Sequence, residues 1–231
     1  MMAWEPLRSK FGAELEFRPF FTIEPLTSRE FREQRINLAE YTAIVFSSRH
    51  AIDAYFKLCE ELRIKVPETE KYFCTTELVA TYLQKHIVYR KRKIFFGDGT
   101  PQSIVSLIGP KHKGEKFLIT KSDSSNTEAI SSLFKAAGLD FSEAVLVKSV
   151  TQDLHDLNLA SYDLTVLYNP SDVKSLQQNF PGFKPEDLHV ISYGHSIVKA
   201  LEEAGITPLV KAPSPEASSA AKAVELYLSG K

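Results

Sequence analysis

Residues 41–56, YTAIVFSSRHAIDAYF, hold a short apolar run, a polar turn and the start of an amphipathic helix. The run AIVF at 43–46 is apolar at every position, which is the pattern of a strand buried on both faces. Ser47, Ser48 and Arg49 then form a polar turn. The apolar residues after the turn share one face of a helix: Ile52, Tyr55, Phe56 and Leu58. This order predicts a βα unit.

The same pattern recurs along the rest of the chain. Further strands are predicted at residues 72–74, 94–96, 116–119, 164–168, 189–192 and 209–210. Each is followed by a polar turn and by apolar residues at helical spacing. Strands that alternate with helices in this way indicate an α/β protein, with parallel sheets covered on both faces.

Two series of these units can be laid on each other. Residues 41–56 match residues 162–177, and residues 74–83 match residues 192–201 in the same order. Thr100-Pro101 then matches Ser214-Pro215, while the separation between matched residues shrinks slowly. We interpret this as two similar lobes that differ by loop deletions. The alternative is that any two parallel α/β segments resemble each other, because this architecture is common.

Composition limits the class of protein. A chain of 231 residues with 43% hydrophobic residues can bury a substantial core. A formal net charge of -1 argues against a dedicated nucleic-acid binder. The basic run at residues 90–93 is interpreted as a solvated face, or as a source of attraction for carboxylates.

The chain shows no targeting or membrane signal. The first residues have neither a basic nor an apolar leader pattern, and no apolar stretch is long enough to span a membrane. Cys59 and Cys74 have no CxxC spacing, which favours reduced, buried thiols and a cytoplasmic location. The six histidines lack metal-binding spacing, so no metal site is predicted.

Small polar residues follow the predicted strands. In parallel α/β units ligands bind at this edge, where helix N-termini present free backbone N–H groups to anions. We therefore predict a site for a ligand with many anionic groups, although plain helix capping prefers the same residues. The candidate binding residues are Ser47, Ser48, Arg49, Thr75, Thr76, Asn169, Ser171, Gly194, His195, Ser196 and Ser214.

Several stretches resemble the uroporphyrinogen-III synthase family. Residues 41–51 are similar to its strand, turn and helix, and residues 191–201 with Ala204-Gly205 are similar to a later motif. Residues 72–74, 82–85 and 89–93 are similar to the Bacteroidetes branch in particular. The resemblance covers nearly the whole chain and depends on the order and spacing of individually loose motifs.

The resemblance implies two flavodoxin-like lobes with parallel sheets, joined by a two-stranded connector. The first lobe would comprise residues 1–20 and 148–231, and the second residues 21–147. Residues 15–21 would form the outgoing strand of the connector and residues 144–150 the return strand.

The resemblance also implies the reaction. The family cyclises hydroxymethylbilane, a linear tetrapyrrole with many carboxylates, inverting ring D and losing water in haem biosynthesis without a metal or organic cofactor. Such a protein acts mainly by positioning its substrate, and a cytoplasmic monomer is expected. A tyrosine on the return strand is often proposed to assist water loss, but Val147 stands there in this chain. Tyr168 or Tyr193 would then take the role, unless both simply pack at the edge of the core.

The alternative class of function is a non-enzymatic module. Two similar lobes with a hinge also suit a protein that closes on an anionic ligand and regulates through it. Formation of the type III isomer from hydroxymethylbilane would distinguish the enzyme from this module.

One departure from the family concerns the start of the chain. Family members begin with a short apolar strand before the helix that residues 6–11 resemble, and no such strand precedes it here. We expect a truncated start or a gene-model error, with a shortened homologue as the alternative. In that case residues 164–167 should border a gap or an open edge, and the chain should be weakly active or inactive.

Overall fold

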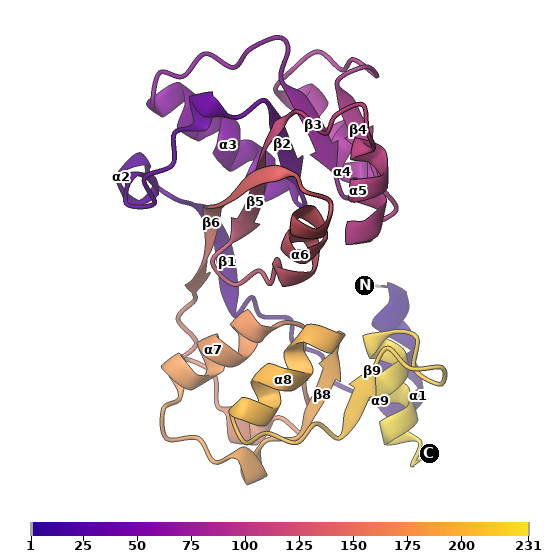
Figure 1. The fold of residues 1–231 in the computed structure, drawn as a ribbon. Helices are drawn as coiled ribbons and strands as arrows, with labels where there is room; N and C mark the ends of the chain where they lie inside the picture. The colour runs from indigo at the N-terminus through magenta and orange to yellow at the C-terminus, as the bar shows by residue number, and fades with distance from the viewer. Residues whose placement is uncertain (1, 231) are drawn as a thin grey trace. The chain divides into compact units, whose positions relative to one another are not determined.

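The computed structural model describes residues 2–230 and divides them into two compact units. Unit 1 contains residues up to Thr22 and from Val150 onward, and unit 2 contains Ile23–Ser149. The chain passes between the units within two strands, β1 (Phe21–Pro25) and β6 (Asp140–Thr151), which are neighbours in one sheet. Figure 1 shows the elements of both units.

Unit 2 is built on a mostly parallel sheet in the order β1-β6-β5-β2-β3-β4. Its other strands are β2 (Ala43–Phe46), β3 (Lys71–Cys74), β4 (Ile94–Phe96) and β5 (Lys116–Ser122). Its helices are α2 (Ser28–Arg32), α3 (Arg49–Glu61), α4 (Glu77–Tyr82), α5 (Pro101–Ile108) and α6 (Glu128–Ala136), with short 3-10 turns at Leu38–Glu40 and Leu83–Lys85. From β2 onward, the parallel strands follow the 3-2-1-4-5 order, which differs from the expected flavodoxin-like 2-1-3-4-5.

The central strand β2 explains why this sheet is covered on both sides. Its four residues are all buried, and successive side chains point to opposite faces. Ile44 and Phe46 pack with α3, whereas Ala43 and Val45 pack with α5 and α6. The apolar run predicted from the sequence is therefore the centre of the larger core.

Unit 1 is built on a smaller parallel sheet of three strands in the order β7-β8-β9. The strands are β7 (Thr165–Leu167), β8 (Val190–Tyr193) and β9 (Val210–Ala212). Its helices are α1 (Glu5–Phe11), α7 (Pro170–Asn179), α8 (His195–Glu203) and α9 (Ala220–Leu228), with 3-10 turns at Met2–Trp4, Leu159–Ser161 and Pro185–Asp187. Helices α7 and α8 cover one face, and α1 and α9 cover the other.

Of the two connector strands predicted from the sequence, the structure contains one at the predicted place. The return strand predicted at residues 144–150 lies within β6, but the outgoing strand predicted at residues 15–21 is wrong, because β1 begins only at Phe21. Pro19 has no N–H to donate to a ladder. Side chains hold this segment instead: the Arg18 guanidinium donates to both carboxylate oxygens of Asp156 at 2.7 and 2.9 Å.

The expected open edge beside residues 164–167 is present. Among the described residues, β7 has a hydrogen-bonded neighbour strand only in β8, so it forms one edge of the sheet of unit 1. No helix within residues 2–230 is long and apolar enough to cross a membrane.

Candidate functional site

In unit 2, the predicted binding residues gather where β2 and β3 end and the next helices begin. The Ser48 hydroxyl accepts from the Ala51 N–H at 3.1 Å and caps α3, and the Thr76 hydroxyl accepts from the Val79 N–H at 3.4 Å and caps α4. The Thr75 N–H donates to the Phe46 carbonyl at 3.0 Å, which fixes the two strand ends to each other. The structure therefore brings both pairs of predicted residues to one edge of this sheet.

The first turn of α3 keeps donors for a ligand. Ser48 occupies only the N–H of the third helical residue, and within residues 2–230 the N–H groups of Arg49 and His50 have no acceptor. Ser47, Arg49 and His50 are exposed or partly exposed. Free N–H groups, the positive end of the helix dipole and an accessible guanidinium together suit a carboxylate.

A polar cluster beside this turn was missed in the sequence. The Asp53 carboxylate lies 2.8 Å from the Tyr82 hydroxyl, 2.7 Å from His86 Nε2 and 3.3 Å from Lys85 Nζ. Arg49 lies over the Tyr82 ring, with its guanidinium carbon 5.6 Å from the ring centroid. The sequence could have predicted one part of this cluster, because Arg49 and Asp53 are one turn apart on α3 and so share a face of the helix.

Hydrogen bonds set the charge of this cluster. Burial raises the pKa of the Asp53 carboxyl, but hydrogen bonds from His86, Tyr82 and Lys85 outweigh burial and hold that pKa below its usual value. The carboxylate therefore stays ionised and fixes the position of Tyr82, over which Arg49 lies. Asp53 and Tyr82 together therefore hold the Arg49 guanidinium beside the first turn of α3.

In unit 1, Asn169 occupies the place after β7 that Ser48 occupies after β2. Its side chain caps α7 by accepting from the Ser171 N–H at 2.9 Å. Asp172 completes the turn, because its carboxylate accepts from the Tyr168 and Asn169 N–H groups at 2.8 and 3.0 Å. Burial raises the pKa of the Asp172 carboxyl, although the hydrogen bonds from these two N–H groups act to lower it. Ser171 is only 4% exposed, so its side chain offers a ligand little surface.

Gly194 leaves the N-terminus of α8 without a side-chain cap. Its φ of 116° lies where other residues are strained, and an added Cβ would stand 3.4 Å from the Tyr168 carbonyl oxygen. His195 and Ser196 follow as accessible residues of the first turn. Among the described residues no side chain accepts from these first N–H groups, so α8 presents a second set of donors for an anion.

Ser214 matches Thr100 in the sequence comparison, but it does not cap the last helix. Thr100 does cap α5, by accepting from the Ser103 N–H at 3.3 Å, but α9 begins only at Ala220 and is capped by Ser219. Ser214 instead stabilises a tight turn, in which its hydroxyl accepts from the Ala217 N–H at 3.1 Å. Three residues with strong turn preferences, Pro213, Ser214 and Pro215, delay the helix.

The two candidate tyrosines lie together at the ends of β7 and β8. Their ring centroids are 5.9 Å apart. The Tyr193 hydroxyl donates to the Ser218 carbonyl at 3.4 Å, whereas the Tyr168 hydroxyl has no partner within residues 2–230, and Tyr168 is 45% exposed. Partial burial raises the pKa of Tyr168, so its hydroxyl stays protonated at neutral pH.

Two other kinds of chemistry find no support. Across residues 2–230 no group of three or more histidine, cysteine or carboxylate side chains is arranged to hold a metal ion. Cys59 and Cys74 are buried, and burial raises the pKa of each thiol to about 12. Neither thiol is available as a nucleophile at neutral pH.

Comparison with known proteins identifies a family. Residues 3–222 match the family model described as uroporphyrinogen-III synthase HemD. A mutant uroporphyrinogen III synthase from the extreme thermophile Thermus thermophilus is similar in structure, with a TM-score of 0.57, 15% identity and coverage of 99% of this chain and 95% of that chain. Uroporphyrinogen-III synthetase from Helicobacter pylori gives 0.55 and 21% identity, with coverage of 91% of this chain and 90% of that chain. No curated protein sequence matches the chain.

Proposed function

The chain belongs to the uroporphyrinogen-III synthase family of tetrapyrrole biosynthesis, and we propose that its helix N-termini hold the carboxylates of hydroxymethylbilane during ring closure. The reaction inverts ring D and loses water. The observation that carries the proposal is the pair of free N–H sets at the starts of α3 and α8. Each lies at the carboxyl edge of a parallel sheet, where α/β proteins bind ligands.

Backbone donors suit this substrate better than a rigid set of side chains. The flexible linear tetrapyrrole must be held in a conformation close to the closed ring, and holding it is the main work of catalysis. Arg49 adds charge in unit 2, where Asp53 and Tyr82 fix its position. Thr75, Thr76, Asn169 and Ser214 shape the turns that present the backbone.

We assign the assistance of water loss to Tyr168 rather than to Tyr193. A departing hydroxide needs a protonated donor that substrate can reach. Tyr168 is exposed, is protonated at neutral pH and has a free hydroxyl among the described residues, whereas the Tyr193 hydroxyl is engaged with Ser218. Tyr168→Phe should lower kcat more than it changes KM, and Tyr193→Phe should change both less.

The test is the product formed from hydroxymethylbilane. Spontaneous closure gives the type I isomer, so the proposal predicts an excess of the type III isomer that grows with protein concentration. Chromatographic separation of the oxidised porphyrins measures this ratio. If the protein binds hydroxymethylbilane but the product stays type I, the chain is a binding module and the proposed catalysis is wrong.

We further propose that the chain acts as a monomer in the cytoplasm. The two buried free cysteines support a reducing compartment such as the cytoplasm, and the monomer is the expectation that comes with the family. Sedimentation velocity at micromolar concentration should give one species of about 26 kDa.

A further inference from the structure

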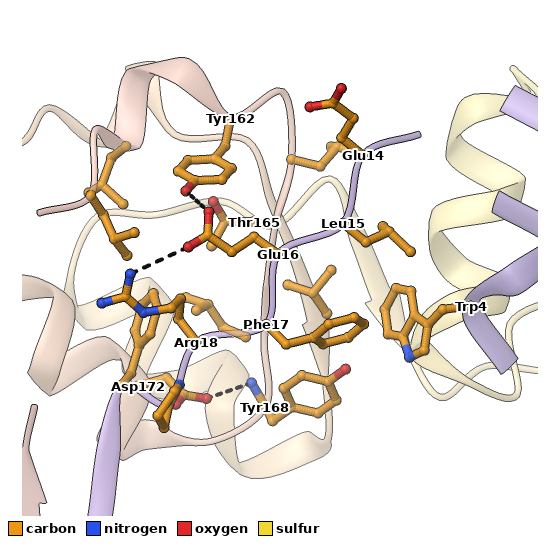
Figure 2. Close-up of a pocket in the computed structure, with 17 residues that line it drawn as sticks. Trp4, Glu14, Leu15, Glu16, Phe17, Arg18, Tyr162, Thr165, Tyr168 and Asp172 are labelled. Atoms are coloured by element: carbon orange, nitrogen blue, oxygen red, sulfur yellow. Dashed lines mark hydrogen bonds and ion pairs between the residues drawn. The ribbon is translucent and has the colours of Figure 1, made fainter. Parts of the chain in front are cut away.

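The exposed side chain of Arg49, in the first turn of α3, has no carboxylate partner within residues 2–230. Its guanidinium lies over the Tyr82 ring, with its carbon 5.6 Å from the ring centroid. Arg18, by contrast, points to Glu16 (Figure 2), with 3.4 Å between the guanidinium and the carboxylate. The N–H donors of the Arg49 guanidinium therefore remain available to an anion from outside the protein.

An ion pair of Arg49 with Asp53 would be the ordinary arrangement. Residues four apart on a helix share a face and come within reach of each other. The same helix pairs two residues at this spacing, because Lys57 Nζ lies 3.9 Å from Glu61 Oε1. Helix α8 contains a pair of the same spacing at 3.8 Å. The separation of Arg49 from Asp53 therefore needs a cause.

Other donors already occupy both oxygens of the Asp53 carboxylate. The Tyr82 hydroxyl donates to Oδ2 at 2.8 Å. His86 Nε2 lies 2.7 Å from Oδ1, and Lys85 Nζ lies 3.3 Å from the same oxygen. Because an ionised carboxylate can only accept, Nε2 carries the proton of its bond. Asp53 is thus bound to α4 and the 3-10 turn after it, and not to Arg49.

Of these donors, His86 is held more firmly than Lys85. Its ring stacks on Phe56, with the centroids 4.6 Å apart and the planes 7° apart. The His86 side chain is 20% exposed, whereas that of Lys85 is 59% exposed. Tyr82 also supports the Arg49 guanidinium directly, so a change there disturbs two contacts at once. His86 is therefore the donor whose effect on Asp53 can be isolated.

We propose that His86 is a positioning residue, which holds the Asp53 carboxylate away from Arg49 so that the guanidinium stays free for a substrate carboxylate. The inference rests on the proposed function, because it takes that carboxylate from the linear tetrapyrrole. A released Asp53 would pair with Arg49 as Glu61 pairs with Lys57. The substrate would then have to displace Asp53 before it could bind.

The first test replaces the imidazole by a ring without a donor. His86→Phe keeps an aromatic ring against Phe56 and removes Nε2. We expect KM for formation of the type III isomer to rise about two- to fivefold, the effect of one exposed ion pair that the substrate has to displace. The kcat should change little, because Arg49 holds the substrate equally well before and during the reaction.

Two control variants accompany this test. His86→Gln keeps an N–H donor for Asp53, so its KM should stay close to that of the unaltered protein. His155→Phe removes a histidine from a similar pair in unit 1, where His155 Nδ1 lies 2.7 Å from Asp153. That variant should leave KM unchanged. A rise in KM in His86→Gln as large as in His86→Phe would overturn the proposal.

The Asp53→Asn background distinguishes positioning from a general structural role. An asparagine has no charge with which to form an ion pair to Arg49. His86→Phe should therefore raise KM when Asp53 is present and have no such effect in Asp53→Asn. An equal rise in both backgrounds would show that His86 acts by another route, and the proposal would be wrong.

The pairing itself can be measured without substrate. Arg49→Gln and Asp53→Asn form a double-mutant cycle, with the free energy of unfolding taken from urea titrations. We expect additive effects in the unaltered protein, and a stabilising interaction between the two residues in His86→Phe. Additive effects in His86→Phe as well would show that Asp53 does not move to Arg49, which contradicts the proposal.

The two kinds of measurement separate this inference from the proposed function. If no type III isomer forms, the proposed function fails, and the stability cycle alone decides whether His86 keeps Asp53 from Arg49. If the cycle shows the new interaction in His86→Phe but KM is unchanged, Arg49 does not hold the substrate. That result would overturn the role of His86 in the reaction.

Discussion

The first predicted strand of each sheet has the same local sequence pattern but different neighbours. In unit 2, β2 lies between β3 and β5, and all four of its residues are buried. In unit 1, β7 pairs with β8 alone among the described strands, and Tyr168 at its end is 45% exposed. An apolar strand followed by a polar cap thus specifies a βα unit, but it does not specify which strands complete the sheet.

The largest expected difference concerns side chains on the two strands. Phe46 is fully buried on β2 and packs against the Tyr55 and Tyr72 rings at centroid distances of 5.6 and 6.2 Å. Phe46→Ala should lower the free energy of unfolding by about 3–5 kcal/mol. Val166→Ala, on the open strand, should lower it by about 1 kcal/mol or less.

Urea titrations followed by circular dichroism measure both values. Trp4 fluorescence adds a probe confined to unit 1. Equal losses for the two variants would mean that β7 is as well packed as β2, and the contrast between the sheets would fail.

The sequence predicted the elements that depend on local pattern, and it missed features that depend on contacts with distant parts of the chain. Ala43–Phe46 was placed correctly because its apolar run and its cap are both local. The strand predicted at residues 164–168 ends earlier, at Leu167, because the Tyr168 N–H turns to the Asp172 carboxylate. The outgoing connector was misplaced because the ion pair of Arg18 with Asp156 joins residues far apart in sequence.

In the candidate site, too, the sequence predicted the local features and missed those that depend on distant residues. Ser48, Thr76 and Asn169 were recognisable because capping is local and favours their side chains. The partners of Asp53 were missed because α3 and α4 meet only in the folded unit. The turn that Ser214 forms with Ala217 was missed, because a serine ahead of a helix has the sequence of a cap.

A smaller effect on the free energy of unfolding is expected from a buried carboxyl of unit 2. Glu70 is 2% exposed and accepts from the Tyr55 hydroxyl at 2.8 Å. Burial raises its pKa, against hydrogen bonds from Tyr72 and Tyr55 and the charge of Lys93. The folded protein therefore holds this proton more tightly than the unfolded chain does.

The sign of the pH dependence follows. The stability that Glu70 contributes is fully present below the ordinary glutamate pKa of about 4.3, and it is lost as pH rises through the raised pKa. Glu70→Gln should remove this dependence and be more stable than the unaltered protein at pH 8, by roughly 1–2 kcal/mol. Glu68→Gln, at an exposed carboxylate two residues away, should leave the profile unchanged.

Thermal unfolding between pH 5 and 9 measures both profiles. A Glu70→Gln profile parallel to that of the unaltered protein would show that Glu70 is ionised in the fold.

The smallest expected effects are at the two equivalent caps. Ser48→Ala and Asn169→Ala should each lower the free energy of unfolding by about 1 kcal/mol. Each should weaken substrate binding by a similar amount, seen as a several-fold rise in KM, because backbone N–H groups supply most of the contacts. Steady-state kinetics on the folded variants decide this. Complete loss of turnover in Ser48→Ala would mean that Ser48 is a nucleophile.

Native-state hydrogen exchange compares the two sheets most directly, amide by amide. We expect the Val45 N–H, within a strand paired on both sides, to exchange only when unit 2 unfolds. On β7, the Leu167 N–H should be protected by β8, whereas the Val166 N–H should exchange almost as fast as in an unfolded chain. Val166 protection equal to that of Leu167 would show that the edge of β7 is already paired, and it would contradict the open sheet of unit 1.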